Sequence, residues 1–452
     1  MRYLLTAILS GLLVCTSSQA SADATSAARV ATFSCDVTPP LGHRLTVEPL
    51  KSVEHPLAAK GIVLDDGSTR YVLCAIDWCI VSNHSYRRIR DKIAAAAGTD
   101  ARHVCVQTVH QHTAPVIDAD AAELLRKTKN PPKLLSTTAE FVDQIADRIA
   151  AAVKESLGRL EPFDTIGTGQ AKVDRIASAR RMPRGDGRVF PPRYSFTKDP
   201  KIRTLPEGQI DPFLRTITLA KGDKPLVRLH YYAVHPQTWY RDGRASFDFV
   251  GLARQALEKK EGVFQVYFTG CAGNVTVGKY NDATPASRDR FMERLQNAME
   301  AAIAATKYVP AGKIQWRSVP LSLPIRDDKG HAQAEFHALA ANAKAKDQMR
   351  GLAARRIVYA NRSDQPIDVS TLRIGNVSIV HLPGEPFLEF QLYAQQLRPD
   401  EFVAVAGYGD GGPCYLCTEA SYAEGGYEPW ASGVKPESET IIRNVIRQAL
   451  AD

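Results

Sequence analysis

The residues best suited to chemistry are two histidines, His110 and His112, which are separated by a single residue. They follow residues 103–108, whose apolar run predicts a buried strand. In an extended segment, side chains two positions apart point the same way, so both imidazoles can face one point. Imidazole nitrogens are common zinc ligands, and the pair therefore indicates a metal site. The pattern alone equally fits two histidines that only form hydrogen bonds.

Two later segments carry further candidate ligands. His230 and His235 lie near the end of an apolar run, and their odd spacing makes them face opposite ways. His235, at the strand end, is better placed to reach a site. Glu385 follows a sharp Pro-Gly turn after the strand-like residues 371–381, where a carboxylate suits zinc. Taken singly, His235 also fits an ordinary core or surface histidine, and Glu385 fits a helix-start carboxylate favoured by the helix dipole.

Two loop segments complete the set. Residues 269–276 (TGCAGNVT) end an apolar run with small residues, which let backbone amides approach a ligand closely. This segment lacks the lysine of a phosphate-binding loop, so nucleotide binding is disfavoured. Tyr415, Tyr422 and Tyr427 lie near the C-terminal end, and loop tyrosines are by themselves ordinary packing residues.

Taken in this order, the five segments resemble the catalytic domain of the neutral/alkaline (non-lysosomal) ceramidase family. The resemblance runs over about residues 30–430 and lies in short motifs. The family's Thr-His-Thr-His-Ser, Ala-Val-His, Pro-Gly-Glu and Tyr-x-x-Thr-x-x-x-Tyr motifs match residues 108–113, 233–235, 383–385 and 415–422. The resemblance implies that zinc (Zn2+) is held by His110, His235, Glu385 and Tyr415.

The same resemblance implies roles for five further residues. His112 becomes a neighbour of the metal that carries a proton to the leaving amine, and Tyr427 a donor to the oxyanion. Arg180, which matches the middle of the family's Asn-Arg-Ser, orients the substrate or stabilises negative charge. Asn274 and Thr276 stand where the family has Asp and Ser, and are expected to bind substrate.

The function expected from these residues is zinc-dependent hydrolysis of a linear amide. Zinc with an open coordination position lowers the pKa of water to about 7, which prepares it to attack a carbonyl carbon. The resemblance implies an N-acyl lipid, similar to ceramide, as the substrate. A small polar or glycan-derived amide or ester is the alternative, since no exposed apolar helix argues for a lipid independently.

Two rival interpretations fit parts of the pattern. An amidohydrolase on a TIM barrel also begins with His-x-His after a strand, but that fold needs eight strand–helix repeats. The β-hairpins predicted here argue against it. A non-catalytic exported binding protein would keep the scaffold without the reaction, and Asn274 in place of the family's Asp supports this interpretation.

The elements that must position these residues alternate between strands and helices. The chain is therefore expected to be α/β, with a mixed β-sheet core flanked by helices. We expect one large domain, residues 23–452, without a C-terminal immunoglobulin-like domain, and no internal repeat is obvious. Helices are expected at 82–97, 138–157, 287–306, 333–354 and 437–450. Strands are expected from residue 30, in a hairpin over 59–80, and at 103–108, 163–173, 215–219, 226–233, 263–269, 371–381 and 402–407, with a long loop at 180–212.

The N-terminal residues and the net charge bear on the cellular location of the protein. Residues 1–22 are expected to be a signal peptide, because Arg2 precedes an apolar run too short to span a bilayer and Ala20-Ser21-Ala22 is a small-residue cleavage site. We therefore expect export to the periplasm or secretion. The formal net charge of +8 is compatible with peripheral membrane contact. The sequence has no strip of interleaved aromatic and basic residues of the kind that binds single-stranded nucleic acid, so nucleic-acid binding is not expected. The oligomeric state stays open.

The cysteines are expected to be structural. Cys74, Cys79 and Cys105 lie in or beside apolar runs and are predicted to be small buried hydrophobes. Cys414 and Cys417 form a CxxC pair without a second pair to complete a zinc ribbon, so a local disulfide, or none, is expected there.

Overall fold

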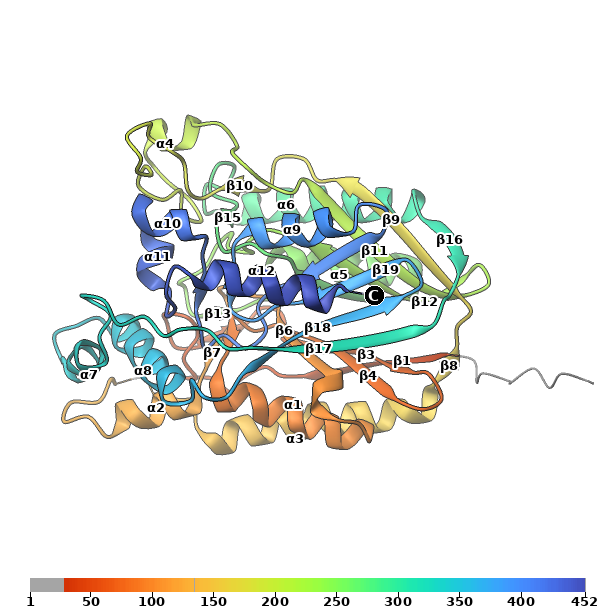
Figure 1. Cartoon of the computed structure of the whole chain (residues 1–452), viewed down its shortest axis with the longest axis horizontal. Coiled ribbons are helices and arrows are strands. Elements are labelled where there is room, and N and C mark those ends of the chain that lie inside the picture. Colours follow the sequence, from red (N-terminus) through yellow and green to blue (C-terminus); the bar gives the residue numbers. More distant parts are fainter. Residues whose placement is uncertain (1–27, 134, 452) are drawn as a thin grey trace, which may run out of the picture.

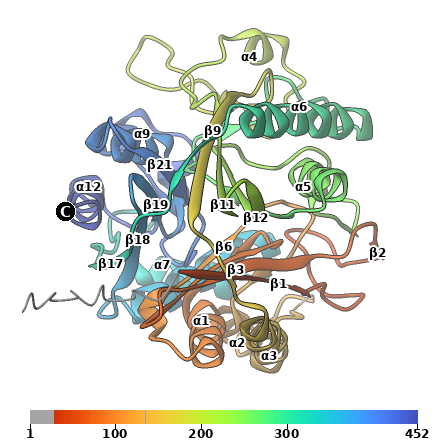
Figure 2. The same cartoon turned by 90° about the vertical axis from the view of Figure 1, so that its right-hand side faces the viewer.

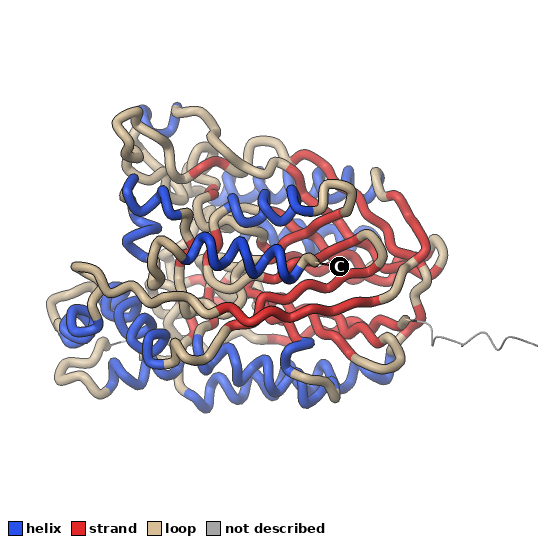
Figure 3. Tube along the Cα trace, in the orientation of Figure 1, coloured by secondary structure: helices blue, strands red, loops and turns tan. Residues whose placement is uncertain are grey.

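The computed structural model describes residues 28–133 and 135–451. Within these residues, three large β-sheets of mixed strand direction meet at a common core, and helices cover their outer faces (Figures 1, 2 and 3). The predicted α/β fold, a mixed-sheet core flanked by helices in one domain, is confirmed. The predicted signal peptide and its cleavage site lie outside the described residues.

The first sheet carries the strand that precedes His110. Its strand order is β6-β4-β3-β1-β8, in which β1, β3 and β4 pair antiparallel and β6 pairs parallel to β4. Helix α1 makes the crossover between β4 and β6, and α3 packs beside it below the sheet (Figure 2). The elements are β1 (Arg29–Asp36), β3 (Ala58–Asp65), β4 (Arg70–Ile76), α1 (Asn83–Ala97), β6 (Val104–Thr108), α3 (Ala139–Ser156) and β8 (Glu161–Pro162).

The second and third sheets repeat this connectivity. In each, two antiparallel pairings are followed by a crossover helix and a parallel strand, and then by a second outer helix. The second sheet comprises β9 (Thr165–Lys172), β11 (Phe213–Lys221), β12 (Lys224–Tyr232), α5 (Asp248–Glu261), β14 (Phe264–Thr269), α6 (Pro285–Ala304) and β16 (Lys307–Pro310). The third comprises β17 (Ile314–Leu321), β18 (Ile367–Ile374), β19 (Val377–His381), α9 (Leu388–Leu397), β21 (Phe402–Ala406) and α12 (Ser438–Ala449).

The three sheets share the order and pairing of their strands and helices but no sequence period, so the repeat is not visible in the sequence. Between its first two strands each unit inserts an excursion of a different kind, over residues 37–57, 173–212 and 322–366. These excursions differ in length and in secondary structure, so no fixed period survives in the sequence. Because neighbouring strands alternate in direction, all three excursions lie at the same end of the molecule as the carboxyl ends of β4, β12 and β19.

Short elements fill this end of the molecule, at the left of Figure 1. The two-residue strands form ribbons: β5 with β7, β10 with β15, β13 with β2, and β20 with β22. Their bounds are β2 (Ser52–Val53), β5 (Ile80–Val81), β7 (Val116–Ile117), β10 (Ser178–Ala179), β13 (Arg244–Ala245), β15 (Val275–Thr276), β20 (Glu385–Pro386) and β22 (Tyr415–Leu416). The helices here are α2 (Ala119–Arg126), α4 (Pro200–Thr204), α7 (Gln333–Ala341), α8 (Asp347–Asn361), α10 (Glu419–Glu424) and α11 (Tyr427–Ala431), and two 3-10 turns lie elsewhere, η1 (Ala101–His103) and η2 (Leu157–Arg159).

Two predicted elements are each divided in the structure. The helix expected at 333–354 is the pair α7 and α8, because Asn342 leaves the helical conformation at φ −76° and ψ 103°. The strand expected at 371–381 is the end of β18 and all of β19, which form a hairpin that turns at Gly375, φ +59°. The long loop expected at 180–212 contains α4. No helix among the described residues is both long and apolar enough to span a membrane.

Candidate metal centre

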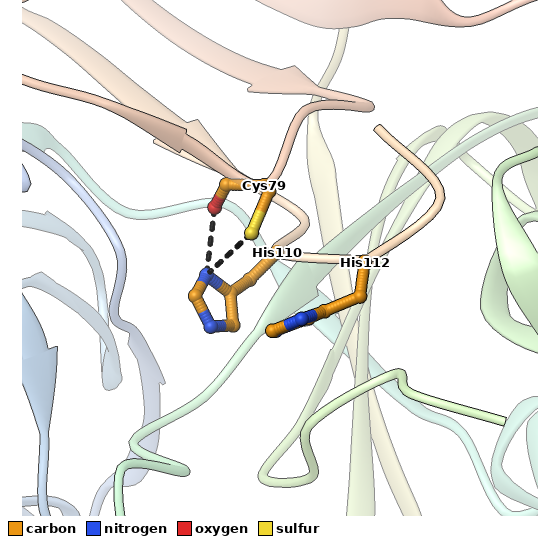
Figure 4. Close-up of side chains that lie close together, drawn as sticks. All are labelled: Cys79, His110 and His112. Atoms are coloured by element: carbon orange, nitrogen blue, oxygen red, sulfur yellow. Dashed lines mark hydrogen bonds between the residues drawn. The ribbon is translucent and has the colours of Figure 1, made fainter. Parts of the chain in front are cut away.

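His110 leaves the end of β6 in a constrained conformation. Its backbone N–H donates to the carbonyl of Trp78 at 2.9 Å, and its φ is +70°, which a residue with a Cβ adopts only at some energetic cost. The ring nitrogen Nδ1 lies 2.6 Å from the carbonyl oxygen of Cys79 and 3.9 Å from its sulfur (Figure 4). A carbonyl oxygen can only accept, so Nδ1 carries the proton and Nε2 presents its lone pair.

His235 is held in the same manner. It follows β12, and its Nδ1 donates to the carbonyl of Ala272, 2.6 Å away, in the glycine-rich segment. Its Nε2 is therefore also left with a free lone pair. His230, by contrast, lies inside the sheet, where its ring nitrogens bond to Thr216 Oγ1 at 2.9 Å and Gln265 Oε1 at 2.7 Å. His230 thus lies within the sheet, whereas His235, beyond the end of β12, lies beside His110 and Glu385.

Glu385 approaches both histidines from the third sheet. Its Oε2 lies 3.3 Å from Nε2 of His110 and 3.4 Å from Nε2 of His235. The preceding Gly384 has φ +63°, and a Cβ there would lie 2.6 Å from the carbonyl oxygen of Cys414. The predicted sharp turn thus brings β20 against β22, where Glu385 and Tyr415 are direct cross-strand partners.

These three side chains form a buried group that suits a divalent cation. Nε2 of His110, Nε2 of His235 and Oε2 of Glu385 lie within 4.8 Å of one another. Each atom is buried and has no hydrogen-bond partner among the described residues. Burying three unpartnered polar atoms is unfavourable unless something else binds them. Two imidazole nitrogens and a carboxylate oxygen, with both Nδ1–H groups held by carbonyls, form a donor set typical of a metal centre.

The charges within the group are strongly coupled. Burial lowers the pKa of His110, but Cys79 and Glu385 outweigh burial and raise it to about 10. Burial lowers the pKa of His235 to about 4. Burial alone would raise the pKa of Glu385, yet His110 and His235 hold it well below its usual value. The carboxylate of Glu385 therefore stays ionised beside the two imidazoles.

Arg180 is the second buried feature of the site. Its guanidinium donates through Nη1 to the hydroxyl of Tyr415 at 3.1 Å and pairs with Glu428, with 2.9 Å between Nε and Oε1. The rings of Tyr194, Tyr415 and Tyr427 lie 5.2 to 5.8 Å from it. The predicted residues Arg180, Tyr415 and Tyr427 thus lie together, joined to Glu385 through the β20–β22 ribbon.

His112 lies beside the group but points elsewhere. Its ring centroid is 5.2 Å from that of His110 and 6.2 Å from that of His235 (Figure 4 shows the first pair). Its Nε2 lies 2.5 Å from Nε2 of Gln237. Burial, followed by the charge of His110, holds the pKa of His112 well below its usual value. The two histidines of the motif are therefore neighbours in different environments.

Asn274 and Thr276 bond within the protein. Asn274 accepts the N–H of Leu388 at 2.8 Å and donates to Glu389 at 2.9 Å, so its side chain holds the start of α9. The backbone carbonyl of Asn274 accepts the backbone N–H of Arg180 at 2.8 Å. Thr276 is fully buried, and its hydroxyl lies 3.4 Å from the carbonyl of Tyr194. Their predicted role in substrate binding stays a prediction.

Several residues at the site carry no motif from which their role could be predicted. Tyr408 stacks on His110 with 4.2 Å between ring centroids, and its hydroxyl is 3.4 Å from Nδ1 of His235. Gln237 contacts His112, and Cys79 supplies the carbonyl that orients His110. The cysteine was expected to be only a small buried hydrophobe. All seven described cysteines are free, so Cys414 and Cys417 form no disulfide.

The fold is shared with solved ceramidases. The neutral ceramidase from Pseudomonas aeruginosa aligns with a TM-score of 0.68 and 14% sequence identity over 93% of this chain and 73% of that one. A ceramidase complexed with C2 aligns with a TM-score of 0.69 and 14% identity over 93% of this chain and 74% of the other. No family model and no curated protein matches the sequence. A likeness at this identity shows the common fold.

Proposed function

We propose that the protein is a zinc-dependent hydrolase that cleaves a linear amide bond. One observation carries the proposal: three buried ligand atoms without a hydrogen-bond partner converge, and each residue follows a strand of a different large sheet. Nitrogen and carboxylate donors together suit zinc among the common metals. We assign His110, His235 and Glu385 as ligands, with Tyr415 as the fourth, because it is the cross-strand partner of Glu385.

The residues around this group suit hydrolysis of a carbonyl compound. Zinc, when bound, supplies Lewis-acid polarisation of a carbonyl and lowers the pKa of water to about 7. His112, half-buried beside the ligands, is placed to carry a proton to the leaving amine. Tyr427 is positioned to donate to the developing oxyanion, and Arg180 orients Tyr415 through its hydrogen bond.

For the substrate we propose an N-acyl compound. The fold is that of proteins named ceramidases. Exposed aromatic rings surround the site region: Tyr194, whose ring lies 6.2 Å from that of Tyr427, is 46% exposed, and Trp430, at 6.1 Å from the same ring, is 38% exposed. Such rings suit contact with an acyl chain. The predicted signal peptide places this activity in the periplasm or outside the cell.

The test combines metal analysis with a substrate panel. Zinc content is measured in the purified protein and in His110→Ala and His235→Ala, with the exposed His337→Ala as the matched control. Hydrolysis of N-acyl amides, with and without lipid tails, is followed in the same samples. We expect about one zinc per chain, retained only in the control, and zinc-dependent hydrolysis. A folded protein that binds no zinc would falsify the metal assignment. Zinc binding without hydrolysis of any amide or ester in the panel would indicate a binding protein on this scaffold.

A further inference from the structure

Two arginines at the site end of the molecule form no ion pair with any described residue. Arg44 lies in the first excursion and Arg355 on α8 in the third. Within the described residues, neither guanidinium forms an ion pair, a hydrogen bond or a contact over an aromatic ring. Nη1 of Arg355 is buried without any partner. Most partly buried arginines in this protein are paired, as Arg181 is with Glu428 at 3.0 Å, so these two need an explanation.

The two excursions meet next to His112. The hydroxyl of Thr46, two residues after Arg44, donates to the carbonyl of His112 at 2.6 Å. Gln348, in the first turn of α8, reaches the carbonyl of Thr46 at 3.5 Å. The loop that carries Arg44 is therefore held between the catalytic histidine segment and the helix that carries Arg355.

Helix α8 also contacts the tyrosine helix, α11. Arg356, next to Arg355, donates to the carbonyl of Trp430 at 2.9 Å, and Trp430 lies one turn beyond Tyr427 on α11. Arg355 itself lies on α8 two turns beyond Gln348, on the same side of the helix, and its charge acts on Tyr427. Neither arginine belongs to the metal group.

The electrostatics agree with this placement. Burial lowers the pKa of Arg44, and Arg355 lowers it further, so the two positive charges act on each other. Arg355 also acts on Tyr427. The carboxylates of Asp347 and Asp118 interact electrostatically with Arg44 and Arg355, respectively, but among the described residues neither forms an ion pair with its arginine. Arginine side chains carry a positive charge in proteins at physiological pH, so an anion is the natural partner for this pair.

We propose that Arg44 and Arg355 together bind an oxyanion on the substrate, a carboxylate or a phosphate ester, beside the scissile amide. Guanidinium groups match the planar geometry of these anions and bind them through paired, charge-assisted hydrogen bonds. The preferred substrate is accordingly an anionic N-acyl compound. A neutral headgroup would leave two adjacent cations unpaired. The identity of the substrate in this inference rests on the proposed amide hydrolysis. The existence of the anion site does not depend on that function.

The first test compares substrates that differ in charge. N-dodecanoylglycine carries a carboxylate, N-dodecanoyl-phosphoethanolamine carries a phosphate, and N-dodecanoylethanolamine is neutral. We expect kcat/KM for at least one anionic amide to exceed that of the neutral amide, and this ratio to fall about ten- to a hundredfold in Arg44→Gln and Arg355→Gln. Arg355→Lys keeps the charge but loses the planar fork, and should lie between.

The matched control is Lys224→Gln, which removes one positive charge from an exposed residue at the far end of β12. It should leave the anionic-to-neutral ratio as in the wild type. Equal kcat/KM for charged and neutral amides, with no change of ratio in the arginine variants, would overturn the inference and leave amide hydrolysis standing. The phosphate and carboxylate arms identify which anion is used.

The second test needs no catalysis. Thermal unfolding is measured in inorganic phosphate and in sodium chloride of the same ionic strength. Phosphate should raise the Tm of the wild type and of Lys224→Gln relative to chloride, and this gain should be absent from Arg44→Gln and Arg355→Gln. The same gain in all four proteins would refute the anion site. If no amide is hydrolysed but phosphate acts as expected, the anion site stands and the proposed function fails.

Discussion

Each candidate histidine ligand has one ring nitrogen bonded to a backbone carbonyl. The carbonyls of Cys79 and Ala272 fix the proton on Nδ1 of His110 and His235, respectively, so that both Nε2 lone pairs face Glu385. This arrangement sets both the tautomer and the ring orientation before any metal arrives. His112 has a different partner, Gln237, which distinguishes it from the ligands although it is only two positions from His110.

The first prediction concerns His112. His112→Gln should retain about one zinc per chain, because the side chain lies outside the converging group. It should lower kcat by about 10²- to 10⁴-fold, the usual effect of losing a proton-transfer group. Zinc content and kcat are measured on the same preparation, with His110→Gln for comparison. Loss of zinc from His112→Gln would make it a ligand instead.

The second prediction concerns His230 and pH. Burial lowers the pKa of His230 to about 4, below its ordinary value of 6.5, so the folded protein keeps the ring neutral. The stability gained in this way is complete above about pH 6.5 and is lost as the pH falls through about 4. It amounts to about 3 kcal/mol at most. The free energy of unfolding should therefore fall more steeply between pH 6.5 and 4 in the wild type than in His230→Gln.

Chemical denaturation at several pH values measures this difference. The exposed His337→Gln is the control and should follow the wild-type profile. Parallel profiles for the wild type and His230→Gln would show that His230 is not held neutral by the fold.

At the scale of elements, short ribbons bring the strand ends together. The β20–β22 ribbon places Tyr415 beside Glu385, and its formation depends on the turn at Gly384. The histidine, Pro-Gly-Glu and tyrosine motifs could be found in the sequence because they are local. Tyr408 could not, since it carries no motif and meets His110 only where the end of β21 lies against the end of β6, with the N–H of Thr108 donating to the carbonyl of Tyr408 at 2.9 Å.

The third prediction tests this ribbon. Gly384→Ala places a Cβ 2.6 Å from a carbonyl oxygen in a conformation with positive φ, so the ribbon must shift and move Glu385. We expect stability to fall by about 1–3 kcal/mol and zinc content to fall with it. Gly222→Ala is the matched control, because φ there is +57° but no atom lies within 4 Å of the added Cβ. It should lose stability and keep its zinc. Equal zinc content in both variants would contradict the role of the turn.

One helix could not be predicted because its buried face contains a polar residue and is therefore not a continuous apolar stripe. Helix α9 was missed, and its buried face includes Gln391, which donates to Asp211 at 2.8 Å. In such a helix, a polar residue with a buried hydrogen-bond partner interrupts the helical spacing of apolar residues on which the prediction depends. By contrast α1, α3 and α12 lie close to their predicted positions, since each has a regular apolar face against one sheet.

At the scale of the whole molecule, the candidate ligands come from three sheets with the same connectivity. The α/β class was predictable from the alternation of strands and helices. The division into three sheets was not, because strand partners are set by tertiary packing and the excursions between them obscure the repeat. His110, His235 and Glu385 are far apart in the chain, and a cation bound to all three would join the three sheets.

The fourth prediction follows from this joining. A ligand that binds only the folded state stabilises it by about 2.7 kcal/mol at a hundredfold excess over Kd. Removal of zinc with a chelator should therefore lower Tm, and zinc should restore it. His235→Ala should have a low Tm that neither treatment changes. The same response to zinc in that variant would mean that the stabilising metal binds elsewhere.

The hairpin turns at Gly67, Gly222 and Gly375 all lie at the end of the molecule away from the candidate centre, because each joins the second and third strands of its sheet. The end that carries the site is crowded with excursions, whereas the opposite end consists of tight connections. For protein engineering, these three turns are accordingly the places at which an affinity tag or a fluorescent reporter can be inserted while the ligand geometry is preserved.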